Sequence, residues 1–127
     1  GAATTLREAK VQRAADSDAV ILQGVEAGGP RLYFESDPEE ASVGLSVLLP
    51  EAARALKLPL IASGGIGSAF SVKGAMMAGA SAVMVGSALA CSPEAGAPKL
   101  MRDAMQAGAH YVGGLDPTIS SPGGWNA

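Results

Sequence analysis

The sequence has little of several features that define common protein classes. It has one cysteine, Cys91, among 127 residues, which excludes an internal disulfide framework and fits a reducing compartment. Aromatic residues make up 4% of the chain, and no apolar run approaches the roughly 18 residues of a membrane span. The net charge of −3 gives no general electrostatic basis for binding nucleic acid or an anionic membrane. We therefore expect a cytoplasmic protein whose partners include neither nucleic acid nor a membrane.

Residues that usually carry acid–base or metal chemistry are also scarce. The single histidine, His110, lies in a segment without hydrophobic periodicity, and no cysteine and histidine cluster has metal-ligand spacing. Four methionines fall at helical spacing and are expected in the core rather than at a metal: Met76, Met77, Met101 and Met105. We expect no metal site, assign no role to His110 and leave the catalytic residues unknown.

Short apolar runs alternate with segments of helical periodicity along the chain. Thr5 and Glu8 have the spacing of a capping box, so a helix is expected to begin at residue 6. Strands that alternate with helices indicate a parallel α/β sheet, whose ligands bind at the carboxyl ends of the strands. After a strand remnant at residue 1, the predicted strands cover residues 19–22, 60–62 and 82–85. The predicted helices cover residues 6–15, 46–58, 69–78 and 99–107, with a short helical turn at residues 88–91.

A long polar segment, residues 30–44, interrupts this alternation. Loops of this length inside a compact domain are usually functional or mobile. Tyr33 and Phe34 are expected either to cover a ligand or to pack within the loop, and the sequence leaves both alternatives open. The acidic residues of the loop are expected to form a solvated face: Asp37, Glu39 and Glu40.

Small residues follow the last two predicted strands. Gly64 and Gly65 come after the strand at residues 60–62, and Gly86 and Ser87 come after the strand at residues 82–85. Because parallel strands end at one edge of a sheet, these residues meet there, and their backbone N–H groups can approach an anion closely. The pattern predicts a phosphate site.

Three glycine-rich segments at successive strand ends carry a resemblance to a known family. They are QGVEAGG at residues 23–29, SGGI at residues 63–66 and MVGS at residues 84–87. Together with LLPE at residues 48–51, they resemble the nitronate monooxygenase (2-nitropropane dioxygenase) family, which includes FMN-dependent enoyl-ACP reductase-like proteins. The resemblance covers about residues 1–105, and the QGxEAGG string is its most specific part.

The resemblance implies a TIM-type (β/α) barrel that holds FMN, of which this chain would form about strands five to eight. Residues 1–108 would then be half of the barrel, and residues 109–127 an irregular tail. By the same resemblance, the FMN phosphate would lie on the backbone at Gly64 and at the 84–87 segment, with Gln23 and Gly28 nearer the ring and ribityl chain. The implied cofactor-binding residues are Gln23, Gly28, Gly64, Met84, Val85, Gly86 and Ser87.

One position departs from the family pattern. Directly after EAGG the family has a histidine that takes the acidic α-proton of the substrate, and this chain has Pro30. Proline has no titratable group, and loss of a general base lowers a rate by roughly 10²–10⁴-fold. Glu26 is either a substitute base or a carboxylate that fixes the loop through backbone N–H groups, and the second interpretation is favoured.

Two functional hypotheses follow. The first is an FMN-dependent monooxygenase or oxidoreductase that oxidises a nitronate or similar carbanion-forming substrate with O2 and is impaired at Pro30. The second is a non-catalytic half-barrel that binds a phosphate-bearing ligand or a partner chain. Four strands cannot close a barrel of eight, and Gly1 lies within an element, so the expected partner is a missing N-terminal half-barrel or a second copy of the chain.

Overall fold

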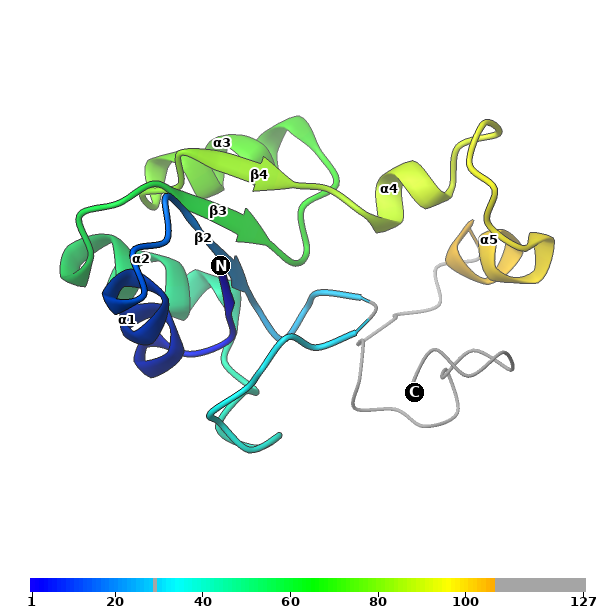
Figure 1. Ribbon diagram of the computed structural model, residues 1–127. Helices are drawn as coiled ribbons and strands as arrows, with labels where there is room; N and C mark the ends of the chain where they lie inside the picture. The colour runs from blue at the N-terminus through cyan, green and yellow to red at the C-terminus, as the bar shows by residue number, and fades with distance from the viewer. Residues whose placement is uncertain (29, 107–127) are drawn as a thin grey trace.

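The computed structural model describes residues 1–28 and 30–106, and within them four parallel strands form one sheet in the order β1-β2-β3-β4 (Figure 1). Each strand is connected to the next through a helix, which is the connection that parallel strands require. The strands are β1 (Ala2–Ala3), β2 (Val20–Gln23), β3 (Leu60–Ser63) and β4 (Ala82–Met84). The predicted α/β class is confirmed, and the half-barrel remains a prediction.

Five helices lie within the same described residues, and three of them pack against the sheet. Helix α1 contacts β1 and β2, α2 contacts β2 and β3, and α3 contacts β4. The last two helices lie to one side of the sheet (Figure 1). The helices are α1 (Leu6–Ala14), α2 (Leu45–Ala55), α3 (Ala69–Met77), α4 (Ser87–Ala90) and α5 (Lys99–Gln106).

The core lies between the strands and the helices that cover them. Alternate strand residues point to opposite faces of a sheet, and Leu22 and Ala62 are fully buried in the core. Their neighbours Ile21 and Ile61 are only partly buried, and Ala82 in the same row is exposed. One face of the sheet is therefore well covered, and the opposite face is more open.

The observed ends of α2 differ from the prediction for a local reason. The helix ends at Ala55 rather than at residue 58, and Leu56 already has extended backbone angles. Pro59 disfavours helical geometry at Leu58, the residue before it, which disfavours the predicted end of the helix at residue 58. Pro50 is the sixth residue of α2, beyond the first turn, and the helix lacks one backbone hydrogen bond there.

The prediction that Met76 and Met77 belong to the core is wrong. Their side chains are 45% and 90% exposed, and Phe70 on the same helix is 86% exposed. Helix α3 packs on the core through Ala75 and Val72, and no described element covers its other side. The side chains of Met101 and Met105, the residue His110 and the tail at residues 109–127 lie outside the described part of the structure.

None of the helices in residues 1–28 and 30–106 combines the length and the apolar character needed to cross a membrane.

Candidate functional site at the carboxyl edge of the sheet

Gln23, Ser63 and Met84 form one row across three neighbouring strands. The register of β2 and β3 pairs Gln23 with Ser63, and the register of β3 and β4 pairs Ser63 with Met84. Each of these residues is the last of its strand. The glycine-rich segments that follow therefore leave the sheet side by side at its carboxyl edge.

Several backbone N–H groups at this edge have no partner among residues 1–28 and 30–106. Within the part of the chain that the structure describes, the amides of Gly64, Gly65, Gly86 and Ser87 donate to no other described residue. A Cβ atom built on Gly86 would meet no heavy atom within 4 Å, so space is open in front of this residue. Backbone donors with open space before them suit an anion such as phosphate.

Gly64 is required at its position for two further reasons. Its φ of +123° lies in the region that L side chains rarely adopt. A Cβ atom on Gly64 would also lie 3.0 Å from the amide nitrogen of Ala27, in the loop after β2. Glycine at residue 64 therefore lets the ends of β2 and β3 approach each other closely.

Gly24 and Glu26 of the QGVEAGG string fix the start of α2. The carboxylate oxygens of Glu26 accept from the backbone N–H of Leu45 at 3.0 and 3.2 Å, where the N-cap residue Gly44 has no side chain to do so. A Cβ atom on the buried Gly24 would lie 2.7 Å from the Leu45 nitrogen and would collide with the Glu26 carboxylate. The interpretation of Glu26 as a carboxylate that fixes the loop through a backbone N–H is confirmed.

Gln23 is buried and uses both ends of its side-chain amide to hold the loop after β2. Its Nε2 donates to the carbonyl oxygen of Pro30 at 2.9 Å, and its Oε1 accepts from the amide of Leu32 at 2.8 Å. These bonds place Pro30 at the carboxyl edge of β2. A contact between Gln23 and a cofactor stays a prediction.

Arg31 attaches the same loop to the rest of the fold, a role that the sequence analysis missed. Its guanidinium donates to the carbonyl oxygens of Gly24 and Ala41. Burial lowers the pKa of Arg31, while the negative charges of Glu26 and Glu8 act in the opposite direction. Arg31 thus joins the two ends of the loop through backbone oxygens.

Glu8 is the second residue that the sequence analysis missed, because its spacing from Thr5 indicated only a capping box. Thr5 does cap α1 by accepting from the Glu8 amide at 3.2 Å. The Glu8 carboxylate, however, is fully buried and accepts from residues before the helix and from the distant loop. Burial raises its pKa, but hydrogen bonds from Thr4, Phe34 and Glu35 outweigh this effect and lower the pKa to about 2.

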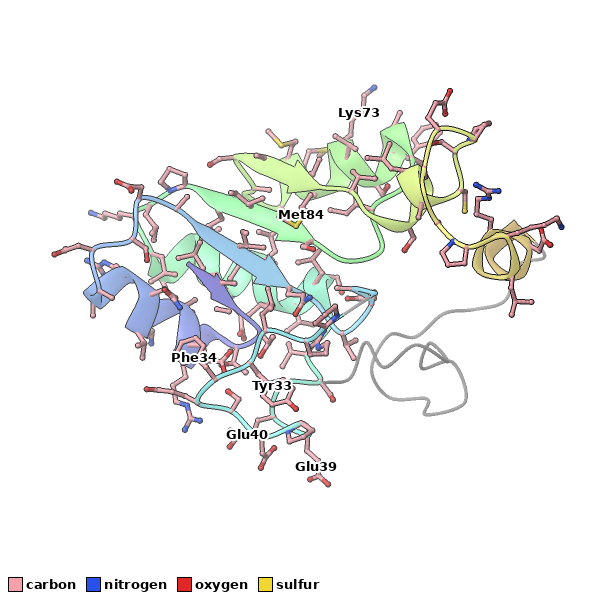
Figure 2. All side chains as sticks on the ribbon, turned by 45° about the vertical axis from the view of Figure 1, so that its right-hand side comes forward. Tyr33, Phe34, Glu39, Glu40, Lys73 and Met84 are labelled. Carbon is pink, nitrogen blue, oxygen red and sulfur yellow. The ribbon has the colours of Figure 1, made fainter. Side chains whose placement is uncertain are left out.

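The acidic part of the loop is solvated, as predicted. Asp37 accepts from the amides of Glu39 and Glu40 at 3.0 and 2.9 Å, and all three residues are exposed. Tyr33 and Phe34, 41% and 48% exposed, lie on this loop on the other side of β2 and β3 from Met84 (Figure 2). Neither aromatic ring is fully packed within the loop.

Known proteins that are similar to this chain identify its family. Residues 1–110 match the family model described as nitronate monooxygenase. The chain belongs to the nitronate monooxygenase family. It is 40% identical over 104 residues to nitronate monooxygenase from Pseudomonas aeruginosa strain PAO1, covering 82% of this chain and 30% of that protein. It is 43% identical over 97 residues to the probable nitronate monooxygenase of Bacillus subtilis, covering 76% of this chain and 28% of that protein.

Solved structures agree with this assignment. The chain is similar to nitroalkane oxidase from Streptomyces ansochromogenes, with a TM-score of 0.77 and 39% identity, over 82% of this chain and 31% of that one. It is also similar to FabK from Thermotoga maritima, with a TM-score of 0.68 and 28% identity, over 80% of this chain and 30% of that one. The chain therefore spans less than a third of these relatives of the nitronate monooxygenase family.

The residues that the family resemblance implied for cofactor binding lie at or next to the carboxyl edge. Gln23 and Met84 end their strands, and Gly64, Gly86 and Ser87 lie just beyond strand ends. Val85 follows β4 and is partly buried, and Gly28 is exposed in the loop after β2. Among the described residues, no group of three or more histidine, cysteine, aspartate or glutamate side chains is arranged to hold a metal ion.

Proposed function

We propose that this chain is part of an FMN-dependent oxidoreductase of the nitronate monooxygenase type, which oxidises a nitronate or a similar carbanion-forming substrate with O2. The observation that carries the proposal is the row formed by Gln23, Ser63 and Met84, followed by backbone amides that have no partner in the described part of the chain. Family membership agrees with this reading of the edge. The single cysteine also favours a cytoplasmic location.

The carboxyl edge fits the phosphate of FMN. The amides of Gly64, Gly86 and Ser87 would donate to the phosphate, with the Ser87 hydroxyl as a further donor, and the open space at Gly86 leaves room for the phosphate oxygens. FMN, when bound, supplies the redox chemistry, and the protein supplies binding and orientation. Met84 and Val85 would line the same segment, with Gln23 and Gly28 nearer the flavin ring.

Pro30 limits what this chain can do with a substrate. No titratable side chain is available at this position to take the acidic α-proton. Glu26, the other candidate base, is engaged by the amide of Leu45 at the start of α2. We therefore propose that nitronate oxidation by this chain is weak or absent.

The four described strands fit about strands five to eight of a TIM-type barrel, with residues 1–108 as the half-barrel. All four run parallel in chain order, as successive barrel strands do. The partner that would complete the barrel is a missing N-terminal half or a second copy of the chain.

A second candidate function is a non-catalytic half-barrel that binds a phosphate-bearing ligand or a partner chain. Pro30 favours this candidate because it removes the base while the backbone of the anion site is retained. Both candidates share the phosphate site and differ in whether a substrate is oxidised.

Titration of the purified chain into FMN, followed by flavin absorbance and fluorescence, tests the proposal. Riboflavin, which has the ring and ribityl chain without the phosphate, is the matched control. We expect FMN to bind, and riboflavin to bind much more weakly because it has no phosphate to accept from the backbone amides of the carboxyl edge. Failure of FMN to bind would contradict the proposed function. Where FMN binds, nitronate-dependent O2 uptake above that of free FMN, even if weak, favours the oxidoreductase over the non-catalytic half-barrel.

A further inference from the structure

Glu8 is in the first turn of α1, yet its carboxylate reaches the loop that follows β2. Its Oε1 accepts from three consecutive amides, those of Phe34, Glu35 and Ser36, at 2.8, 3.0 and 3.0 Å. Its Oε2 accepts from the amide and the hydroxyl of Thr4, both at 2.8 Å. One buried carboxylate therefore joins the residues after β1 to a loop 26 to 28 residues away in sequence.

Three consecutive amides that point to one oxygen form a concave anion-binding site in the backbone. Here the anion is the protein's own carboxylate rather than a ligand. Arg31, whose pKa the charge of Glu8 raises, donates to the carbonyl oxygens of Gly24 and Ala41, and no ion pair joins Arg31 to Glu8. The amides at residues 34–36 thus depend on Glu8 as their acceptor.

The loop is also held by other side chains, from two parts of the chain. Gln23 binds Pro30 and Leu32, and Arg31 binds Gly24 and Ala41, so both contacts join the loop to residues between β2 and α2. Thr5 and Arg7, which also follow β1, reach the loop as well: the Thr5 hydroxyl lies 3.0 Å from that of Ser36, and Arg7 donates to the carbonyl oxygen of Glu35 and pairs with Glu40. None of these side chains accepts from the amides of residues 34–36. Loss of Glu8 would therefore remove the acceptor of these three amides while the other contacts persist.

We propose that Glu8 is a positioning residue, which acts as an internal anion to fix residues 34–36 and thereby sets where Tyr33 and Phe34 lie beside the carboxyl edge. Any effect of this loop on catalysis rests on the proposed function, because the loop matters for the reaction only if FMN binds at the carboxyl edge. The contact between Glu8 and the loop does not depend on FMN, so it can be tested without the cofactor.

Hydrogen exchange of the FMN-free chain, with and without added formate, tests this role in the Glu8→Ala variant. Loss of hydrogen bonds to a charged acceptor should speed exchange of the Phe34, Glu35 and Ser36 amides by about tenfold or more. Formate, a carboxylate small enough for the space left by the side chain, should restore part of the protection. Glu26→Ala is the matched control, because it removes another carboxylate bonded to a backbone N–H and should leave residues 34–36 protected.

Three results would overturn the proposal: unchanged exchange at residues 34–36, faster exchange spread equally through α1 and β2, or no effect of formate. The second would show that Glu8 supports the fold in general rather than the loop. If Glu8→Ala does not fold, Glu8→Gln is measured in its place. Its amide group removes the charge at nearly constant volume and keeps a single acceptor oxygen, which cannot serve both Thr4 and residues 34–36 as the carboxylate does. Protection should therefore fall at one of the two, and unchanged protection of both would overturn the proposal.

Discussion

Gln23 holds the backbone of Pro30 and not its side chain. The bond runs from Nε2 of Gln23 to the carbonyl oxygen of Pro30 at 2.9 Å, and the amide of Leu32 completes the contact at 2.8 Å. Pro30 itself is exposed. The hydrogen bond that holds the loop at residue 30 therefore does not need the proline ring, and another side chain can be placed there.

Pro30→His should raise nitronate oxidation by about an order of magnitude or more, because it introduces a general base at the position where the family resemblance implies one. The measurement is nitronate-dependent O2 uptake by the chain at saturating FMN. Pro30→Ala is the control, since it changes the loop backbone without adding a base, and it should stay as inactive as the wild type. Robust turnover by the wild type at neutral pH would show that another residue acts as the base.

Gly86→Glu should abolish FMN binding, because it adds bulk and negative charge to the space in front of the strand end. The matched control is Gly74→Glu on α3. A Cβ atom at Gly74 likewise meets nothing within 4 Å, so the same charge is added to open space away from the carboxyl edge. FMN titration of both variants measures the difference. Equal affinity for FMN in Gly86→Glu and the wild type would place the phosphate elsewhere.

The fold was largely predictable because its signals are local. Apolar runs mark β2 and β3, and Ser68, a residue type favoured just before a helix, caps α3 by accepting from the Ser71 amide at 3.2 Å. The exposure of Phe70 and Met77 was not predictable. Helical spacing shows which residues share a face, but it does not show whether another element covers that face.

The glycine positions of the candidate site could be predicted from the sequence. The long-range hydrogen bonds around the site could not. Gly64 and Gly86 stand next to apolar runs, so their place at the strand ends follows from the sequence. The contact of Glu8 with residues 34–36 spans a long separation in sequence, and Thr5 offered a sufficient local reason for a glutamate at that position. Arg31 binds only backbone oxygens, which leave no trace in side-chain composition.

Glu8 should make stability depend on acidity below about pH 4.5. Its pKa falls from 4.5 to about 2 in the folded chain, so the carboxylate stabilises the fold above pH 4.5, and this stabilisation is lost as the pH falls toward 2. A shift of this size corresponds to roughly 3 kcal/mol in the free energy of unfolding. Urea unfolding at pH 6 and pH 3 should show the loss in the wild type. Glu8→Gln should reduce the difference between the two pH values, and an unchanged difference would contradict the assignment to Glu8.

Glu26→Ala should lower the free energy of unfolding by about 1 kcal/mol, the usual effect of losing a cap at a helix start. The reason is that the amide of Leu45 loses its acceptor, and Gly44 has no side chain to replace it. Chemical denaturation measures the change. Glu26→Gln is the control, because its side-chain oxygen can still accept from Leu45 and should preserve most of the stability. If Glu26→Gln instead abolished nitronate oxidation at unchanged stability, Glu26 would be the missing base.

The isolated chain should not be a stable monomer. Strands β1 and β4 are the edges of the described sheet, and Ala82 and Met84 on β4 are exposed. Unpaired edge strands recruit other strands, and a parallel sheet is stable when both of its faces are covered. In the absence of an N-terminal half-barrel, β4 of one copy can pair with β1 of a second copy, and the same contact made twice gives eight parallel strands.

Light scattering at micromolar concentration should therefore give twice the mass of the chain or more. Changing Phe70 and Met77 on α3 to lysine is the control, and it should leave the mass unchanged if the strand edges drive association. A monomer mass together with a cooperative thermal transition would contradict this prediction.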